Sequence, residues 1–141
     1  MPKPPVHNSF GQLHDELLDI FINAIDHTEY DLDTYLDSRD EPEFDGAWVR
    51  ADEAVEAVKK SFADAGTLEA AATKLRQAVF MHCIRALGHP DLAAYVSDDA
   101  GLLFDAKAME VDNEWIAGLL ASYREGKLPA GPGYEAAAAG V

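Results

Sequence analysis

The sequence has little of several features that would narrow its function. It contains one cysteine, Cys83, which excludes an internal disulfide and favours a reducing compartment. No apolar run approaches the roughly 18 residues that span a bilayer. The N-terminal segment MPKPPVHNSF lacks the apolar core of a secretory signal. We therefore expect a cytoplasmic protein with no membrane partner.

Positive charge is also scarce. The chain has 11 Lys and Arg against 26 Asp and Glu, and the basic residues are dispersed. A protein that binds duplex nucleic acid needs Lys and Arg to replace the counterions along the phosphates. We expect no direct binding of nucleic acid.

Motifs for catalysis, cofactors and metals are missing as well. The sequence has no Glu-x-x-His, no His-Glu-x-x-His and no cysteine pair, which are common metal-binding patterns. The acidic run between Asp31 and Glu41 lacks the glycine of an EF-hand loop. The sequence therefore predicts no catalytic residue, no cofactor and no metal ligand, and we expect that the protein is not an enzyme.

A strong helical pattern is present. Hydrophobic residues make up 48% of the 141 positions, which is enough for the core of one domain. They recur every three or four positions, and no run alternates as a half-buried strand does. We predict an all-α fold, an irregular single-domain helical bundle of about five or six helices. It is expected over 9–129, after a flexible lead-in at 1–8 and before a disordered Gly/Ala-rich tail at 130–141.

Capping residues, glycines and prolines mark the expected helix ends. Segment 38–46 is interpreted as an exposed loop, and 97–111 as a broken or short helix. The apolar run VFMHCI, at 79–84, predicts that its helix is the central one and that His82 and Cys83 lie in the core. The predicted helices cover about 10–27 (capped by Ser9), a short piece between Thr28 and Pro42, the segment from Asp45 to Gly66, then 68–87 after Thr67 and before Gly88, 90–96 starting at Pro90, and the segment from Asn113 to Gly126.

The acidic residues are concentrated in one segment. Between His14 and Asp45 lie twelve Asp and Glu and a single basic residue, Arg39, so this segment carries −11 of the net charge of −15. A field of one sign attracts cationic partners. Aromatic residues lie among these acids, and the centres of protein interfaces favour Tyr and Trp.

This segment has two interpretations. It is either a solvated surface that keeps the protein soluble or a surface that binds a basic protein. Under the second interpretation, the expected partner-binding residues are Asp26, Glu29, Tyr30, Asp31, Asp33, Tyr35, Asp37, Asp40, Glu41, Glu43, Asp45 and Trp48.

In size, acidity and helical content, the chain resembles bacterial immunity proteins and antitoxins as a class. That likeness implies a protein that binds a basic toxin, such as a nuclease, and blocks its active site. Two alternatives are a nucleic-acid-mimic inhibitor and a small helical ligand-binding domain or enzyme. The last would use a pocket near His82, His89 and Asp91. An oligomeric scaffold is a further possibility, and the oligomeric state stays open.

Overall fold

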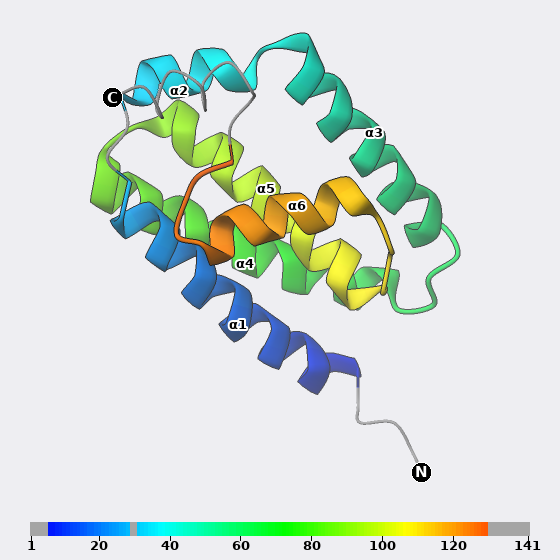
Figure 1. The fold of residues 1–141 in the computed structure, drawn as a ribbon. Coiled ribbons are helices and arrows are strands. Elements are labelled where there is room, and N and C mark those ends of the chain that lie inside the picture. Colours follow the sequence, from blue (N-terminus) through cyan, green and yellow to red (C-terminus); the bar gives the residue numbers. More distant parts are fainter. Residues whose placement is uncertain (1–5, 29–30, 130–141) are drawn as a thin grey trace.

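Six helices account for most of the chain. The computed structural model describes residues 6–28 and 31–129, and none of these residues forms a strand. The predicted all-α, single-domain bundle is confirmed. Figure 1 shows the six helices: α1 (Val6–Asp26), α2 (Leu32–Arg39), α3 (Pro42–Lys59), α4 (Ala65–Leu87), α5 (Pro90–Ala108) and α6 (Glu114–Arg124).

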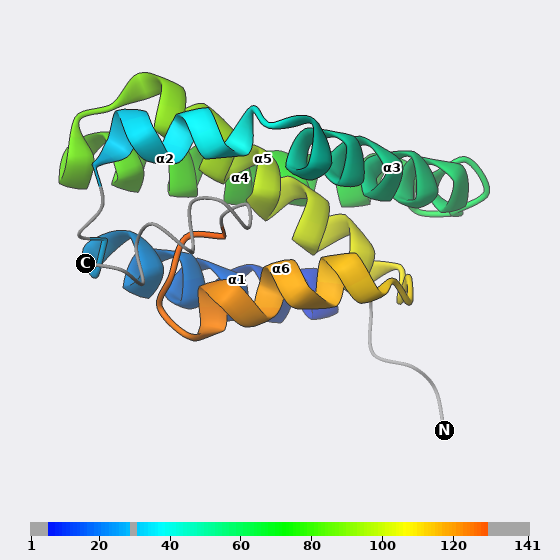
Figure 2. The same ribbon diagram turned by 45° about the horizontal axis from the view of Figure 1, so that its top comes forward.

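The centre of the bundle is α5. Every residue from Asp99 to Ala106 is buried, so this helix is covered on all sides. It packs most extensively against α4, and α1 packs against both. Figure 2 shows α2 and α3 along one edge of the domain and α1 and α6 along the opposite edge, with α5 crossing between them. Helix α5 therefore contacts helices on both edges, including α3 on one and α1 and α6 on the other.

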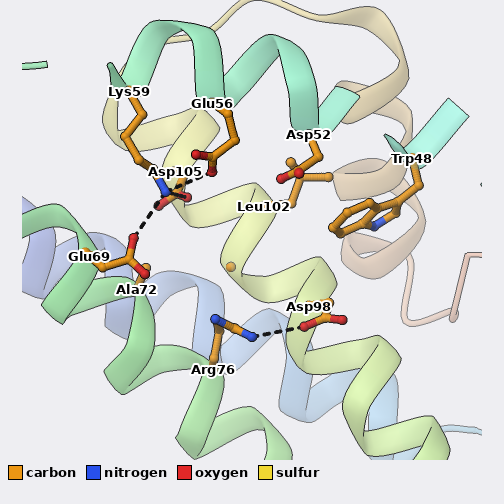
Figure 3. A pocket seen from close by; sticks show the side chains of 11 residues that line it. Trp48, Asp52, Glu56, Lys59, Glu69, Ala72, Arg76, Asp98, Leu102 and Asp105 are labelled. Atoms are coloured by element: carbon orange, nitrogen blue, oxygen red, sulfur yellow. Dashed lines mark hydrogen bonds and ion pairs between the residues drawn. The ribbon is translucent and has the colours of Figure 1, made fainter. Parts of the chain in front are cut away.

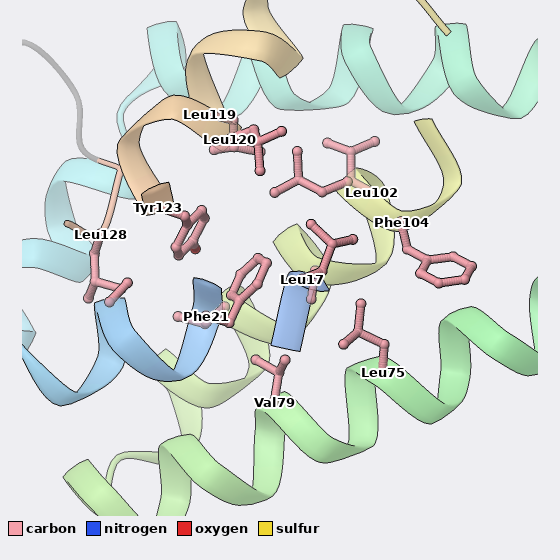
Figure 4. Packing of buried hydrophobic residues seen from close by; sticks show 14 of the residues in the cluster. Leu17, Phe21, Leu75, Val79, Leu102, Phe104, Leu119, Leu120, Tyr123 and Leu128 are labelled. Atoms are coloured by element: carbon pink, nitrogen blue, oxygen red, sulfur yellow. The ribbon is translucent and has the colours of Figure 1, made fainter. Parts of the chain in front are cut away.

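The core is aliphatic and aromatic. Phe21 of α1 and Tyr123 of α6 have ring centroids 4.1 Å apart, and Phe10 meets the edge of Phe104 at 5.7 Å. Figure 4 shows side chains from α1, α4, α5 and α6 converging on this region. Buried rings and aliphatic groups of this kind provide most of the favourable free energy of folding.

Several predicted helix boundaries are confirmed. Gly88 ends α4 in the left-handed conformation at φ 64°, Pro90 opens α5, and Asn113 caps α6 by accepting a hydrogen bond from the amide of Ile116. Cys83 is fully buried, as predicted.

Other predictions about helices are wrong. The segment 97–111 is not broken, because α5 runs without interruption to Ala108. The central helix is α5 rather than α4, which buries one stripe and leaves Met81 46% exposed. His82 is only partly buried, so it is not a core residue.

The predicted loop at 38–46 is also wrong. Helix α2 continues to Arg39, and Pro42 opens α3, where a missing N–H costs nothing. Asp45 therefore lies in the first turn of α3 instead of capping it, and Ser38 and Arg39 are buried.

Helix starts shift elsewhere too. Asp31 rather than Thr28 caps α2, and α1 begins at Val6, so Ser9 lies within it. Helix α4 begins at Ala65, which places Gly66 and Thr67 inside the helix. The remainder of the predicted lead-in and the predicted tail, at 1–5 and 130–141, lie outside the described residues.

Candidate functional site

Three carboxylates project from one face of α2. Asp33, Asp37 and Asp40 are spaced by four and three residues, which places them on the same side of a helix, and all three are exposed. The helix is capped by Asp31, whose side chain accepts hydrogen bonds from the amides of Asp33 and Thr34. This cap fixes the first turn, and with it the direction of the acidic face.

The first half of α5 lies opposite this face. Asp91, Tyr95 and Asp98 follow the same helical spacing, and together with the residues of α2 they enclose a depression of about 470 Å³. We call it the acidic groove. It is lined by Asp33, Leu36, Asp37, Asp40, Asp91, Ala94, Tyr95 and Asp98. Five of these eight residues are carboxylates and none is Lys or Arg, so the groove is negative along its length.

Two hydrogen bonds connect the walls of the acidic groove. The hydroxyl of Tyr95 donates to Asp40 at 2.5 Å, and Nε2 of His89 lies 3.1 Å from Oδ1 of Asp33. The bond to Asp40 raises the pKa of Tyr95, with a smaller contribution from burial. These contacts join the two walls of the groove, and the carboxylates of Asp37 and Asp91 stay exposed to solvent.

A second depression, of about 230 Å³, lies between α3, α4 and α5 (Figure 3). We call it the α3 notch. Its two cations are already paired: Lys59 lies 2.8 Å from Asp105 and also meets Glu56 and Glu69, and Arg76 lies 3.1 Å from Asp98. The groove and the notch share Asp98, so one acidic surface extends over both.

Local geometry in the α3 notch depends on a glycine and on burial. A Cβ at Gly101 would lie 2.7 Å from Cδ of Arg76, so the glycine lets the arginine stem cross α5 toward Asp98. Burial raises the pKa of Asp52, and the charge of Glu56 adds to the effect. Burial also raises the pKa of Asp105, with Lys59 acting in the opposite direction.

Beneath the acidic groove lies a buried ion pair. The guanidinium of Arg39, 3% exposed, donates two hydrogen bonds to the fully buried carboxylate of Asp99, at 2.9 and 3.0 Å. Asp99 also accepts from Nε1 of Trp48 at 2.9 Å and from the hydroxyl of Tyr123 at 2.5 Å. Four donors from three helices thus satisfy one carboxylate, as a buried charge requires.

The surroundings adjust to this pair. Burial lowers the pKa of Arg39, but the charge of Asp99, the two tyrosines Tyr35 and Tyr123 and the hydrogen bond to Asp99 together raise the pKa above its ordinary value. Burial, followed by the charge of Asp99, raises the pKa of Tyr123 well above 10. Tyr35 accepts a hydrogen bond from Arg39 at 3.1 Å and donates one to the carbonyl of Pro129. Arg39 therefore stays charged at neutral pH, and Tyr35 joins α2 to the end of the described chain.

Comparison with protein families gives a single clear result. A family model described as "Immunity protein PIM1" matches residues 13–130, which is most of the chain. The chain belongs to the PIM1 immunity protein family. No curated protein matches it. An immunity protein acts by binding a toxin, so family membership implies a protein partner and favours a non-enzymatic inhibitor.

In this immunity protein, most of the predicted partner-binding carboxylates are exposed. Asp26 lies on α1 and meets His82 of α4 at 2.7 Å, away from the groove lining. Glu29 and Tyr30 lie outside the described residues. The exposed acids of α2 and of the turn into α3 are Asp31, Asp33, Asp37, Asp40, Glu41, Glu43 and Asp45.

Of the three aromatic residues predicted to reach the partner, the two that lie within the described residues occupy different places. The side chain of Tyr35 is fully buried, which puts it behind the acidic surface rather than on it. Trp48 is partly buried, lines the α3 notch and donates its N–H to Asp99.

Sequence reasoning missed the α5 wall of the groove. Asp91 is predicted only as part of the alternative enzyme pocket, and Tyr95 and Asp98 are not among the predicted functional residues. Their spacing of four and three residues, equal to that of Asp33, Asp37 and Asp40, was the available signal. The partnership of Arg39 with Asp99 left no comparable signal, because the two residues are 60 positions apart.

The three polar residues of the alternative enzyme hypothesis do not share one site: Asp91 lines the acidic groove, and His82 does not. His82 pairs with Asp26, whereas His89 caps α5 through Nδ1 and faces Asp33. Within residues 6–28 and 31–129, no group of three or more His, Cys, Asp or Glu is arranged to hold a metal ion. None of the helices described combines the length and apolar character needed to traverse a bilayer.

Proposed function

We propose that this chain is a bacterial immunity protein that neutralises a basic toxin, with the acidic groove as its main contact surface. The observation that carries the proposal is the convergence of five carboxylates from α2 and α5 on one groove without a competing Lys or Arg in its lining. Membership in an immunity protein family supplies the partner class, a protein toxin.

Charge gives this surface a mechanism. A negative groove on a protein of net charge −15 attracts a basic partner from a distance and orients it before contact. Lys and Arg that a nuclease uses to hold phosphate would pair with Asp33, Asp37 and Asp91 instead, and the bound helices would block access to its active site. The partly buried ring of Tyr95 supplies an aromatic contact at the middle of the groove.

The α3 notch is proposed as the continuation of this surface. Its carboxylates are partly neutralised by Lys59 and Arg76, so it attracts cations less strongly than the acidic groove does. Glu41 caps α3, and Glu43 and Asp45 lie in its first turn, where all three extend the negative field. We propose that the protein acts in the cytoplasm, where the buried thiol of Cys83 stays reduced.

The first experiment isolates the toxin and then tests the groove. Tagged protein is used to capture its partner from native lysate at low salt, and the partner is identified by mass spectrometry and purified. Association with the purified toxin is then measured by stopped-flow at several salt concentrations. The proposal requires a basic toxin whose association slows steeply as salt rises.

Two triple variants separate the groove from overall charge. Asp33→Asn/Asp37→Asn/Asp40→Asn alters the groove, and Asp15→Asn/Glu16→Gln/Asp19→Asn alters three exposed acids of α1. Each changes the net charge from −15 to −12, by removing three charges. Asparagine keeps an oxygen that can accept from Tyr95 and His89.

The groove variant should lower the association rate constant roughly tenfold, the lower end of what electrostatic steering provides, and should flatten its salt dependence. The α1 variant should have a much smaller effect. Equal effects of the two variants would show that only net charge matters, and an unchanged rate in the groove variant would exclude the groove as the contact surface.

A further inference from the structure

Interactions within helix α2 are too few to stabilise it on their own. It spans eight residues, fewer than an isolated helix needs to be stable in water. Its exposed carboxylates repel one another. Its attachment to the domain therefore depends on its buried residues, which are Tyr35, Leu36, Ser38 and Arg39.

Among these, Arg39 makes the contact that most strictly fixes the orientation of α2. Two parallel hydrogen bonds to Asp99 fix both the position and the plane of the guanidinium. The same group lies over the ring of Phe44, 4.4 Å from its centroid, and 5.3 Å from the centroid of Tyr95. Arg39 thus joins the buried carboxylate to Tyr95, a wall of the acidic groove.

Asp99 forms hydrogen bonds with side chains from three other helices. It sits on the central helix α5 and accepts from Arg39 at the end of α2, from Trp48 of α3 and from Tyr123 of α6. All four of the hydrogen bonds to it come from within the domain, and the carboxylate has no exposure to solvent. A carboxylate with this arrangement sets where the surrounding elements lie relative to α5.

An apolar contact would hold α2 less specifically. Buried ion pairs contribute little net stability compared with well-packed apolar residues, but they can select one arrangement over others. A shift of α2 by one position would rotate its side chains by about 100° and turn Asp33 and Asp37 out of the acidic groove. The paired hydrogen bonds of Arg39 can form in only one orientation of α2 about its axis.

We propose that Asp99 is a positioning residue, which holds α2 through Arg39 so that its carboxylates form one wall of the acidic groove. Its effect on toxin binding rests on the proposed function, but its effect on α2 does not. Loss of the pairing leaves α2 mobile, and only the fraction of molecules with α2 in place presents the complete groove.

Hydrogen exchange of the free protein tests the positioning role without any ligand. In Asp99→Asn, protection of the α2 amides, Tyr35 to Arg39, should fall by at least about tenfold, while amides of α1 and α4 keep theirs. The matched control is Asp105→Asn, which removes another buried acid of α5 that pairs with a cation, Lys59 of α3. In this control, α2 should stay protected.

A milder variant distinguishes geometry from charge. Arg39→Lys keeps the positive charge but cannot form the paired hydrogen bonds, so it should loosen α2 in the same direction as Asp99→Asn. It also keeps the test informative if Asp99→Asn does not fold. Full protection of α2 in Arg39→Lys, or a uniform loss over all helices in Asp99→Asn, would overturn the positioning role.

The purified toxin then links α2 to function. The apparent Kd rises by the inverse of the fraction of molecules with α2 in place, so a tenfold rise for Asp99→Asn requires that its α2 amides are almost unprotected, while Asp105→Asn should bind with nearly unchanged affinity. If α2 loses nearly all its protection and the toxin binds as before, the positioning role stands and the acidic groove is not the contact surface. If α2 keeps its protection in Asp99→Asn, the positioning role is excluded whatever the toxin does.

Discussion

The ion pair between Arg39 and Asp99 leads to a double-mutant cycle with a large coupling energy. Arg39→Met leaves Asp99 charged and fully buried, although it still accepts from Trp48 and Tyr123. We expect the free energy of unfolding to fall by about 3 kcal/mol. Asp99→Leu removes the carboxylate from a guanidinium that is 3% exposed and also strands two donors, so we expect a loss of about 5 kcal/mol.

The double variant Arg39→Met/Asp99→Leu should be more stable than these losses suggest. It removes both charges and replaces them with apolar side chains, and the remaining cost comes from the stranded hydroxyl of Tyr123 and N–H of Trp48. At about 1–2 kcal/mol each, they account for a loss of about 3 kcal/mol. The sum of the single losses is about 8 kcal/mol, so the coupling energy is about 5 kcal/mol.

Urea unfolding followed by far-UV circular dichroism measures all four proteins of the cycle. The total stability expected for a domain of this size, about 10 kcal/mol, leaves room to measure each loss. The matched control is the cycle of Arg76 and Asp98, an arginine–aspartate pair between helices whose side chains are 45% and 48% exposed. Its coupling energy should stay below about 1 kcal/mol. A coupling energy this small for Arg39 and Asp99 would refute the reasoning.

Three further predictions concern charge, pH and the thiol. Because the net charge is −15, raising salt from about 0.01 to about 1 M should raise the midpoint of thermal unfolding, and a lower midpoint would count against self-repulsion. The raised pKa of Asp52, caused by burial and then Glu56, means that the folded protein binds this proton more tightly than the unfolded chain, so the stability contribution is lost as pH rises above 3.8. Asp52→Asn should therefore melt at a higher temperature than the parent at neutral pH, with the difference vanishing below pH 3.8, and melting curves over this range would show the opposite trend if the sign were wrong. Burial raises the pKa of Cys83 to about 11, so at about pH 8 roughly one thiol in 10³ is ionised, and a thiol reagent should label the native protein far more slowly than the urea-unfolded protein.

Helices with one buried face could be predicted from the sequence. In α1 and α4 the buried residues recur every three or four positions, as in Leu68, Ala72, Leu75 and Val79. Helix α5 gave no such period, because its neighbours cover every side. Gly101, Asp99 and Asp105 are unusual in a buried helix, so the sequence pattern indicates a broken one. In the folded protein Asp99 pairs with Arg39, Asp105 pairs with Lys59, and Gly101 leaves room for Arg76.

Only one of the two walls of the acidic groove could be predicted from the sequence. Its α2 wall lies in a continuous run of acids, which composition alone singles out. Its α5 wall consists of separate residues, Asp91, Tyr95 and Asp98, whose common direction matters only once α2 lies opposite. The sequence places Arg39 as a single basic residue in an exposed loop, because Asp99, the acid that pairs with it, follows 60 positions later.

The buried carboxylate also sets an order of events during synthesis. Arg39 and Trp48 precede Asp99 by 60 and 51 residues, and Tyr123 follows it by 24. On the ribosome, α2 is therefore complete long before its anchor exists, and the last donor arrives only with α6. Contacts between such distant positions close late in folding. A nascent chain that stops before Tyr123 thus carries every acid of α2 but lacks one of the four hydrogen bonds to Asp99.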